Sequence, residues 1–386
     1  MRRIRRTHVL VAAAAVALSV PTAGVSEGTG LPTTIGKGEG KLTLIEWSAY
    51  SDPSFAKKFE QQSGCKINRK DANSSNEMVA LMRTGGGGGG GQYDLVSASG
   101  DASLRLIYGG DVQPVNVNLI PSWRNFISIF KSPAHNTVDG VHYGVSVQWG
   151  PNTLLYNTKQ VKPAPTSWGA IYSSKYKGKI TVPDNPIQIA DAALYLSKSK
   201  PSLGIKDPYE LTKSQLDAAV SLLKSERKLT KKYWESSADE INLFKSGDAV
   251  IGASWPYQTL QLQAAKAPVK ELIPKEGATG WADTWMLAKK AAHPNCAYMW
   301  MKYVTTPQVE AKQALVFGET PVNPKACPYM NKIQKGLCND YHLNEPGSYF
   351  KQIKFWKTPI PQCGWNSSSD CMDYNAWVQA WAQVTG

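Results

Sequence analysis

The early part of the chain alternates between short apolar segments and segments with helical spacing, and this alternation constrains the fold more than any other feature. Strands are predicted at residues 41–47, 65–67 and 93–97. Between them, residues 53–62 carry apolar side chains at helical spacing, and residues 75–83 follow the Asn and Ser residues that often begin a helix. Because strand–helix–strand connections place parallel strands in one sheet, the sequence predicts an α/β fold.

The length of 386 residues suits two domains, and the share of hydrophobic residues, 42%, is that of a folded protein. Seven consecutive glycines at 85–91 separate the second predicted helix from the third predicted strand. A phosphate-binding loop would follow a strand and would be followed by Lys and then Ser or Thr. Neither condition is met, so we interpret the glycines as a surface connection.

The N-terminus has the pattern of an export signal. A basic stretch with four arginines precedes a short apolar run at 8–20, and small residues follow Pro21, so residues 1–24 are predicted to be a signal peptide. The apolar run is too short to cross a hydrocarbon core of ~30 Å. We therefore expect an exported protein, periplasmic or extracellular, without the lipoprotein cysteine that would anchor it. The Arg5-Arg6 pair leaves the twin-arginine route open beside the general one.

The formal net charge of +13 falls by four once the arginines of the predicted signal peptide are removed. The remaining basic residues are scattered along the chain and form no stripe beside aromatic residues. This pattern is typical of a solvated basic surface, and we expect no binding of nucleic acid.

Six cysteines in an exported chain predict disulfides. The expected pairs are two local ones, Cys327 with Cys338 and Cys363 with Cys371, and one long-range pair, Cys65 with Cys296. No CxxC motif occurs and the five histidines are not grouped, so no bound metal is expected.

Signatures of catalysis are missing from the sequence. It contains no GxSxG or HExxH motif, and no Cys/His arrangement outside the expected disulfides. His142 and His293 are isolated, and the acidic pair Asp239-Glu240 is predicted on a solvated helix. We expect no enzyme and no cofactor, although two distant carboxylates of a glycosidase would leave no local motif.

A series of short motifs follows the first predicted strand in a regular order. They are EWSAY at 46–50, YDLV at 93–96 leading to Ser99, PTSW at 165–168, YKGKI at 176–180, GDAV at 247–250 leading to Trp255, PKEG at 274–277, WAD at 281–283 and GETP at 318–321. In order and spacing this series resembles the bacterial spermidine/putrescine-binding proteins, which are extracellular solute-binding proteins of ABC importers. The resemblance covers roughly residues 41–325, and the cysteine-rich segment that follows resembles the family poorly.

The resemblance implies a two-lobed periplasmic-binding-protein fold with crossing hinge strands and a ligand cleft. Lobe one would comprise 41–148 with 284–325, and lobe two 149–283 with 326–386. Loops at the carboxyl ends of the strands would hold the ligand, and the lobes would close around it. The implied partners are a small amine ligand and an ABC permease complex in the membrane, and the receptor is expected to be a monomer.

The resemblance also implies which residues bind the ligand, carried over position by position. They are Trp47, Tyr50, Ser99, Asp101, Asn185, Gln188, Trp255, Trp281, Asp283 and Glu319. Asp283 matches the carboxylate that holds an amino group, whereas Asn185 and Gln188 stand where the family has acids. Glu319 stands where the family has an aromatic residue, and Asp101 replaces one nearby. The aromatic residues could instead belong to the core, and Asp101 could be the N-cap of a helix at 102–108.

The resemblance implies an amine-type, polyamine-like solute, and these differences leave its identity open. A buried ammonium group needs a carboxylate, and each aromatic face adds cation–π attraction of ~0.5–2 kcal/mol. A monoamine, another diamine, an amino acid derivative or a quaternary ammonium compound would fit. The alternatives are a receptor for a sugar or other non-amine solute, which Asn185, Gln188 and Gln258 would suit, and a secreted glycoside hydrolase.

Overall fold

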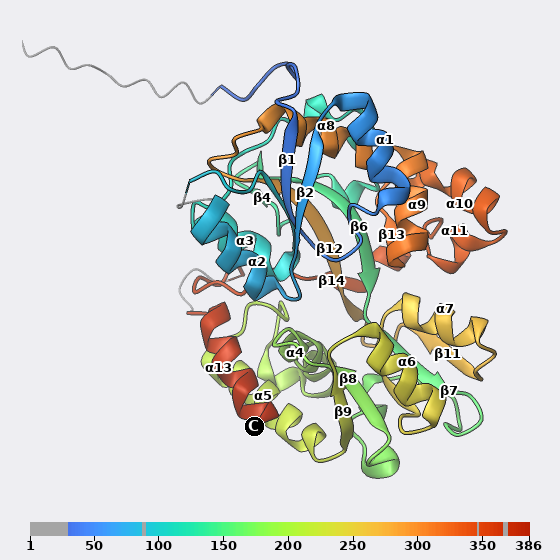
Figure 1. Cartoon of the computed structure of the whole chain (residues 1–386). Helices are drawn as coiled ribbons and strands as arrows, with labels where there is room; N and C mark the ends of the chain where they lie inside the picture. The colour runs from blue at the N-terminus through green and yellow to red at the C-terminus, as the bar shows by residue number, and fades with distance from the viewer. Residues whose placement is uncertain (1–29, 87–89, 346, 366–369) are drawn as a thin grey trace, which may run out of the picture. The chain divides into compact units, whose positions relative to one another are not determined.

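A computed structural model describes residues 30–86, 90–345, 347–365 and 370–386. The predicted signal peptide, 1–24, lies outside the described residues, and so does part of the glycine segment. The chain from Pro32 to Gly386 forms one compact unit that contains two main sheets (Figure 1). Among the described residues, no helix is both long and apolar enough to cross a membrane.

The larger sheet has the strand order β13-β6-β12-β3-β1-β2, and β14 pairs with β12. Its strands are β1 (Lys41–Glu46), β2 (Lys66–Asp71), β3 (Leu95–Ser99), β6 (Val145–Pro151), β12 (Ala278–Leu287), β13 (Thr320–Pro321) and β14 (Ile353–Phe355). β1 is parallel to β2 and β3, whereas β12 runs antiparallel to β3 and β6. The βαβαβ unit predicted from the sequence is therefore present and gives this sheet its parallel half.

Helices cover both faces of the larger sheet. They are α1 (Pro53–Ser63), α2 (Ser75–Leu81), α3 (Gly100–Tyr108), α8 (Pro294–Val304), α9 (Pro307–Phe317) and α12 (Gly347–Phe350). Two further helices, α10 (Cys327–Ile333) and α11 (Leu337–Asp340), pack on the outside of α9. Alternate residues of β1 enter different cores: Leu42 and Leu44 pack in one, and Ile45 packs in the other. This alternation is what a strand with two buried faces requires. We call this sheet with its helices the large-sheet lobe.

The smaller sheet has the strand order β11-β7-β10-β8-β9. Its strands are β7 (Thr153–Asn157), β8 (Ile180–Pro183), β9 (Thr230–Trp234), β10 (Ile251–Ser254) and β11 (Val269–Leu272). The helices associated with it are α4 (Gln188–Ser199), α5 (Lys213–Arg227), α6 (Ser237–Ser246), α7 (Pro256–Ala264) and α13 (Tyr374–Thr385). We call this sheet with its helices the small-sheet lobe.

Three stretches of chain connect the lobes, between β6 and β7, between β11 and β12, and between β14 and α13. β6 ends in the larger sheet at Pro151, and β7 begins in the smaller sheet only two residues later. The chain returns from β11 of the smaller sheet to β12 of the larger one. The lobe boundaries given above stay a prediction, and the C-terminal segment has contacts with both lobes. β14 pairs with β12, whereas α13 packs on α5.

Short elements complete the described chain. They are the two-stranded β4 (Thr137–Val138) and β5 (Val141–His142), the π-helix η1 (Met82–Gly86), and the 3-10 helices η2 (Val117–Leu119), η3 (Pro121–Asn125), η4 (Ser128–Phe130), η5 (Trp168–Ala170), η6 (Ser174–Tyr176), η7 (Pro201–Leu203) and η8 (Pro324–Ala326).

Disulfides join the three cysteine pairs expected from the sequence. They are Cys65–Cys296, Cys327–Cys338 and Cys363–Cys371. The first links the residue before β2 to α8 over a sequence separation of 231 residues, and the others close loops of the C-terminal segment.

Candidate functional site

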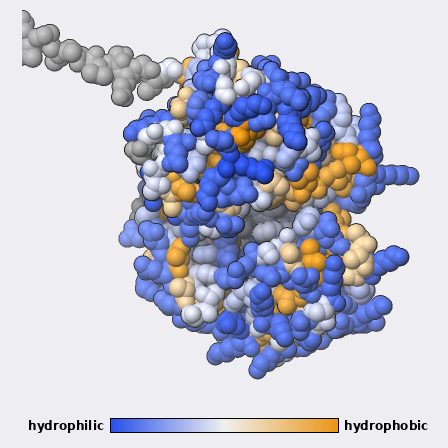
Figure 2. All heavy atoms as spheres, in the orientation of Figure 1, coloured by the Kyte–Doolittle hydropathy of each residue, from blue (hydrophilic) through white to orange (hydrophobic). Residues whose placement is uncertain are grey.

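A cavity of about 450 Å³ lies where the two lobes face each other, and both contribute to its wall. The space-filling view shows the hollow between the lobes (Figure 2). Residues of the predicted set that line it are Trp47, Ser99, Asp101, Asn185, Trp255, Trp281, Asp283 and Glu319. The tertiary structure therefore brings most of the predicted residues into one wall.

The ends of strands place these side chains. In the large-sheet lobe, Trp47 directly follows β1 and Ser99 is the last residue of β3. In the small-sheet lobe, Trp255 directly follows β10 and Asn185 lies two residues beyond β8. The carboxyl ends of parallel strands meet at one edge of a sheet, and in open α/β sheets ligands bind beyond this edge.

The cavity wall is acidic although the chain is basic. Carboxyl groups of Asp101, Asp184, Glu235, Asp283 and Glu319 line it, and its described lining residues include no Lys, Arg or His. Asp101, Asp283 and Glu319 are buried, whereas Asp184 and Glu235 are exposed. The cavity therefore presents negative charge or neutral acid to any occupant.

Asp283 and Glu319 lie on either side of one tyrosine hydroxyl. The Tyr50 hydroxyl is hydrogen-bonded to Asp283 Oδ2 and lies 2.6 Å from Glu319 Oε2. Ser99 Oγ donates to Asp283 Oδ1 at 2.5 Å. Burial raises the pKa of Asp283 to about 7, although the hydrogen bonds from Ser99 and Tyr50 oppose this rise. Burial, together with the nearby Asp283 carboxyl, holds the pKa of Glu319 well above its ordinary value.

Asp101 has its own set of partners. Ser75 Oγ donates to Asp101 Oδ1 at 2.8 Å, and the Tyr374 hydroxyl lies 3.5 Å from Oδ2. Burial raises the pKa of Asp101, and the bond from Ser75 and the charge of Arg105 oppose the rise. The alternative that Asp101 is a helix N-cap is wrong, because Ser99 is the N-cap of α3 and Asp101 lies in its first turn.

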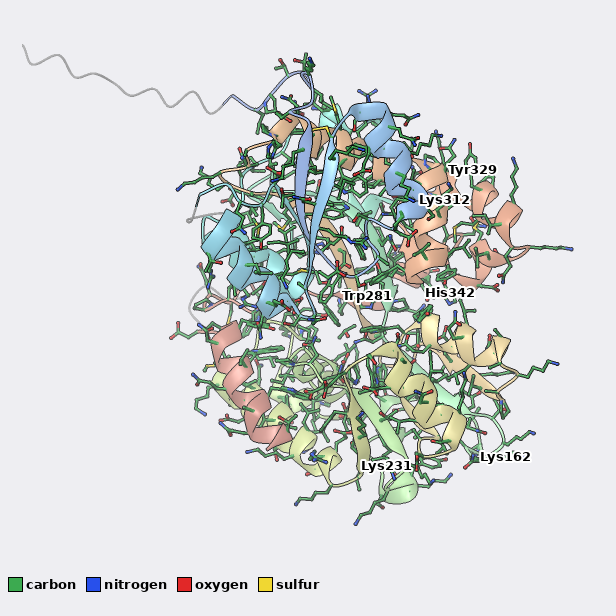
Figure 3. All side chains as sticks on the ribbon, in the orientation of Figure 1. Lys162, Lys231, Trp281, Lys312, Tyr329 and His342 are labelled. Carbon is green, nitrogen blue, oxygen red and sulfur yellow. A yellow bond between two sulfur atoms is a disulfide. The ribbon has the colours of Figure 1, made fainter. Side chains whose placement is uncertain are left out.

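Tryptophan side chains form the apolar part of the wall. The rings of Trp255 and Trp281 meet edge to face with centroids 6.0 Å apart, and Trp234 meets Trp255 at 4.8 Å. Trp255 Nε1 donates to Asn152 Oδ1 at 3.0 Å, which fixes the orientation of the indole. The Trp281 ring packs over Gly150, where a Cβ atom would lie 2.3 Å from the ring. Figure 3 places Trp281 between the two lobes.

Two residues of the predicted set lie outside the cavity wall. Tyr50 is buried behind it in the core and acts on the site through its bonds to Asp283 and Glu319. Gln188 begins α4 and is buried. It is not among the residues that line the cavity.

Sequence reasoning missed lining residues from the C-terminal segment and from the start of α2. Trp356 and Tyr374 line the cavity, yet they lie in the segment that the family resemblance does not cover. The Trp356 carbonyl approaches Gly100 so closely that a Cβ atom there would lie 2.0 Å from its oxygen. Ser75 was identified only as part of a helix start, and no local pattern links it to Asp101.

Comparison with known proteins agrees with this geometry. A family described as bacterial extracellular solute-binding proteins matches residues 54–336. The spermidine/putrescine-binding periplasmic protein of Escherichia coli is 24% identical over 280 residues, which cover 72% of this chain and 76% of that protein. The putrescine-binding periplasmic protein PotF of Escherichia coli is 27% identical over 321 residues, covering 78% of this chain and 80% of that protein.

The solved structures show the same fold. The TpPotD lipoprotein of Treponema pallidum superposes with a TM-score of 0.70 at 19% identity, over 89% of this chain and 99% of that one. The family match spans well over half of the sequence and includes strands of both sheets. The chain therefore belongs to the bacterial extracellular solute-binding proteins.

Proposed function

We propose that this protein is the receptor of an ABC importer for a small organic cation with a polyamine-like amine group. The receptor captures the cation in the cavity between its lobes and delivers it to a permease complex in the membrane. The acidic cavity of an otherwise basic chain carries this proposal. The names of the two Escherichia coli relatives, a spermidine/putrescine-binding and a putrescine-binding protein, point to the same ligand class.

The energetics of the buried carboxyls favour a cationic occupant over a neutral or anionic one. An ionised carboxylate without a partner is costly in a buried site, and an ammonium group supplies the missing charge and hydrogen-bond donors. Asp283 has hydrogen bonds from Ser99 and Tyr50 but no cation in the cavity wall. A sugar would leave this group uncompensated, whereas an amine would pair with it.

Besides the carboxyl groups, the tryptophans and the side-chain amide of Asn185 offer contacts to the ligand. Indole faces attract cations by ~0.5–2 kcal/mol each and also pack against methylene groups. Trp255 and Asn185 come from the small-sheet lobe, whereas Asp283 comes from the large-sheet lobe. A ligand held by both lobes stabilises the closed arrangement, which is the form a permease would recognise.

Under the same proposal, the protein is exported, it is a monomer and it does not react with its ligand. A receptor of this kind works outside the cytoplasmic membrane, binds one solute in one cavity and releases it unchanged. No nucleic acid or cofactor takes part.

Identification of a co-purified ligand tests the proposal most directly. Native mass spectrometry of the purified protein should detect a bound organic cation at one copy per chain. Calorimetry with putrescine, cadaverine, agmatine and spermidine should then show binding of at least one of them, with a neutral sugar as control. A co-purified sugar, together with no binding of any amine, would overturn the proposal.

A further inference from the structure

The Tyr50 hydroxyl has two carboxyl neighbours but only one proton. It is hydrogen-bonded to Asp283 Oδ2 and lies 2.6 Å from Glu319 Oε2. A phenol donates one hydrogen bond, so the second close oxygen–oxygen contact requires a proton from a carboxyl group. Tyr50, Asp283 and Glu319 are only 1%, 2% and 6% exposed, so water has little access to these contacts. The geometry therefore requires one carboxyl of the pair to be protonated.

Electrostatics also indicate that one of the two carboxyl groups is protonated. Two buried carboxyl groups that share a site without a cation cannot both ionise, and they titrate as a coupled pair. Asp283 also accepts from Ser99, which stabilises its charged form, whereas Glu319 has only the Tyr50 contact. Glu319 is therefore the neutral member: it donates to the Tyr50 oxygen, and Tyr50 donates to Asp283.

No cation of the described residues forms an ion pair with either carboxyl. Among the charged and titratable groups on the elements around the pair are Asp101 and Arg105 of α3, Tyr257 of α7, Glu310 and Lys312 of α9, and Tyr341 after α11. Arg105 lies over the Tyr374 ring and donates to Asn76. Lys312 is exposed to solvent. His342, labelled in Figure 3, faces Glu345 at 3.1 Å and Glu271 at 3.9 Å instead. No Lys or Arg occurs among the described residues of the cavity wall.

We propose that Asp283 and Glu319 form a carboxyl pair that holds one proton in the empty receptor and exchanges it for the cationic group of the ligand. Both residues line the cavity, so one ammonium group can donate to both. The Glu319 O–H bond breaks, its proton leaves to solvent, and the ammonium hydrogen bonds replace it. The bound cation balances the carboxylate charge that this step creates. This inference deepens the proposed function and rests on it.

Exchange of a proton for a cation makes the affinity depend on pH with a definite sign. Because binding releases a proton, the affinity rises with pH while the empty pair is protonated. The rise is about tenfold per pH unit for one proton and levels off once the empty pair has lost it. A receptor whose carboxyls are both ionised before binding would show no such dependence.

Calorimetry with putrescine at about pH 8, above the pKa of Asp283 of about 7, in phosphate and in Tris, measures the number of protons released. We expect about one proton per putrescine for the wild type and none for Glu319→Gln, which keeps the shape and loses the titratable group. Glu226→Gln is the matched control, because Glu226 is a buried carboxyl bonded to Thr230 and Tyr233 but lies outside the cavity wall. This control should release as many protons as the wild type.

Infrared spectroscopy of the ligand-free protein tests the pair independently of any ligand. The wild-type spectrum minus that of Glu319→Gln should contain the carbonyl band of a protonated carboxyl at neutral pH. Glu319→Leu serves the same purpose if the Gln variant does not fold. Equal proton release in wild type and variant, or a missing difference band, would overturn the pair. A clear band without binding of putrescine or spermidine would support the pair and refute the amine receptor.

Discussion

The two sides of the cavity recognise a ligand by different physical means. The large-sheet lobe contributes buried carboxyls, Asp101, Asp283 and Glu319, each bonded to a hydroxyl of its own lobe or of the C-terminal segment. The small-sheet lobe contributes indole rings, an amide and carboxyls that are exposed to solvent. In the proposed receptor, charge recognition therefore rests with one lobe, whereas the other supplies shape and the contacts that favour closure.

The difference follows from burial. A buried carboxylate destabilises the protein when the cavity holds no cation, and it binds a cation strongly when one is present. Its removal should therefore change the affinity for the ligand greatly. An exposed carboxylate is screened by water, and its contribution is small. Substitutions on the two sides should therefore differ in size as well as in kind.

The largest effect is expected for Asp283→Asn, which keeps the shape and removes the charge. The ammonium group of the ligand would lose its buried partner, a loss on the order of 2–5 kcal/mol. Affinity for the amine should fall at least ~30-fold, as measured by calorimetry. Asp184→Asn is the control from the small-sheet lobe, because this carboxyl is exposed, and it should bind within about threefold of the wild type. Binding by folded Asp283→Asn within threefold would abolish the contrast between the sides.

The same substitution should stabilise the empty protein. Burial raises the pKa of Asp283 from 3.8 to about 7, so the folded state binds more protons than the unfolded state between these values. Stability of the unliganded wild type should therefore fall as pH rises through about 4 to about 7. The raised pKa of Asp191 and of Glu226, both about 7, adds to this trend.

Asp283→Asn removes one of these contributions and should raise the free energy of unfolding at pH 7 by on the order of 1–3 kcal/mol. Denaturant unfolding of wild type and variant without ligand, at several pH values, measures this effect. A wild type whose stability rises with pH over this window would contradict the sign of the prediction.

A smaller effect is expected for the indole of Trp255. Trp255→Leu removes the aromatic face and should reduce affinity by ~0.5–2 kcal/mol, or roughly 2- to 30-fold. Trp255→Phe keeps a face but loses the bond from Nε1 to Asn152, so its loss should be the smaller of the two. Calorimetry on both variants measures these losses of affinity. If Trp255→Leu lowers the affinity more than Asp283→Asn does, the small-sheet lobe dominates ligand recognition and the comparison is reversed.

The smallest change is expected in overall dimensions. Ligand contacts on both sides should favour closure, so the radius of gyration from small-angle scattering should decrease slightly with saturating ligand. Asp283→Asn should show the decrease only at higher ligand concentration, because its weaker binding needs more ligand for saturation. An unchanged profile of the wild type at saturation would indicate that the two sides do not act together.

Local patterns in the sequence were sufficient for much of the fold. The alternation of apolar segments and helical spacing predicted the βαβαβ unit. Cysteine spacing predicted the two local disulfides, and the remaining two cysteines were assigned to the third. β2 extends from Lys66 to Asp71, well beyond the predicted 65–67. The prediction was too short because the sequence of this strand, KINRKD, is mostly polar. It lies at the edge of the sheet, where most of its side chains are exposed, so no apolar alternation reports its length.

The sequence by itself determined the βαβαβ unit through local periodicity, and the family resemblance of its short motifs implied the two-lobed architecture and the presence of Trp281 and Asp283 at the cavity, because such motifs stay adjacent along the chain. Only the tertiary structure decided the partners of each carboxyl. Tyr374 meets Asp101 across 273 residues, and Tyr50 bridges Asp283 and Glu319 from behind the wall. Gln188 is buried outside the cavity wall. Such contacts depend on which distant segments pack together and on how deeply each group is buried, and no local pattern of residues contains that information.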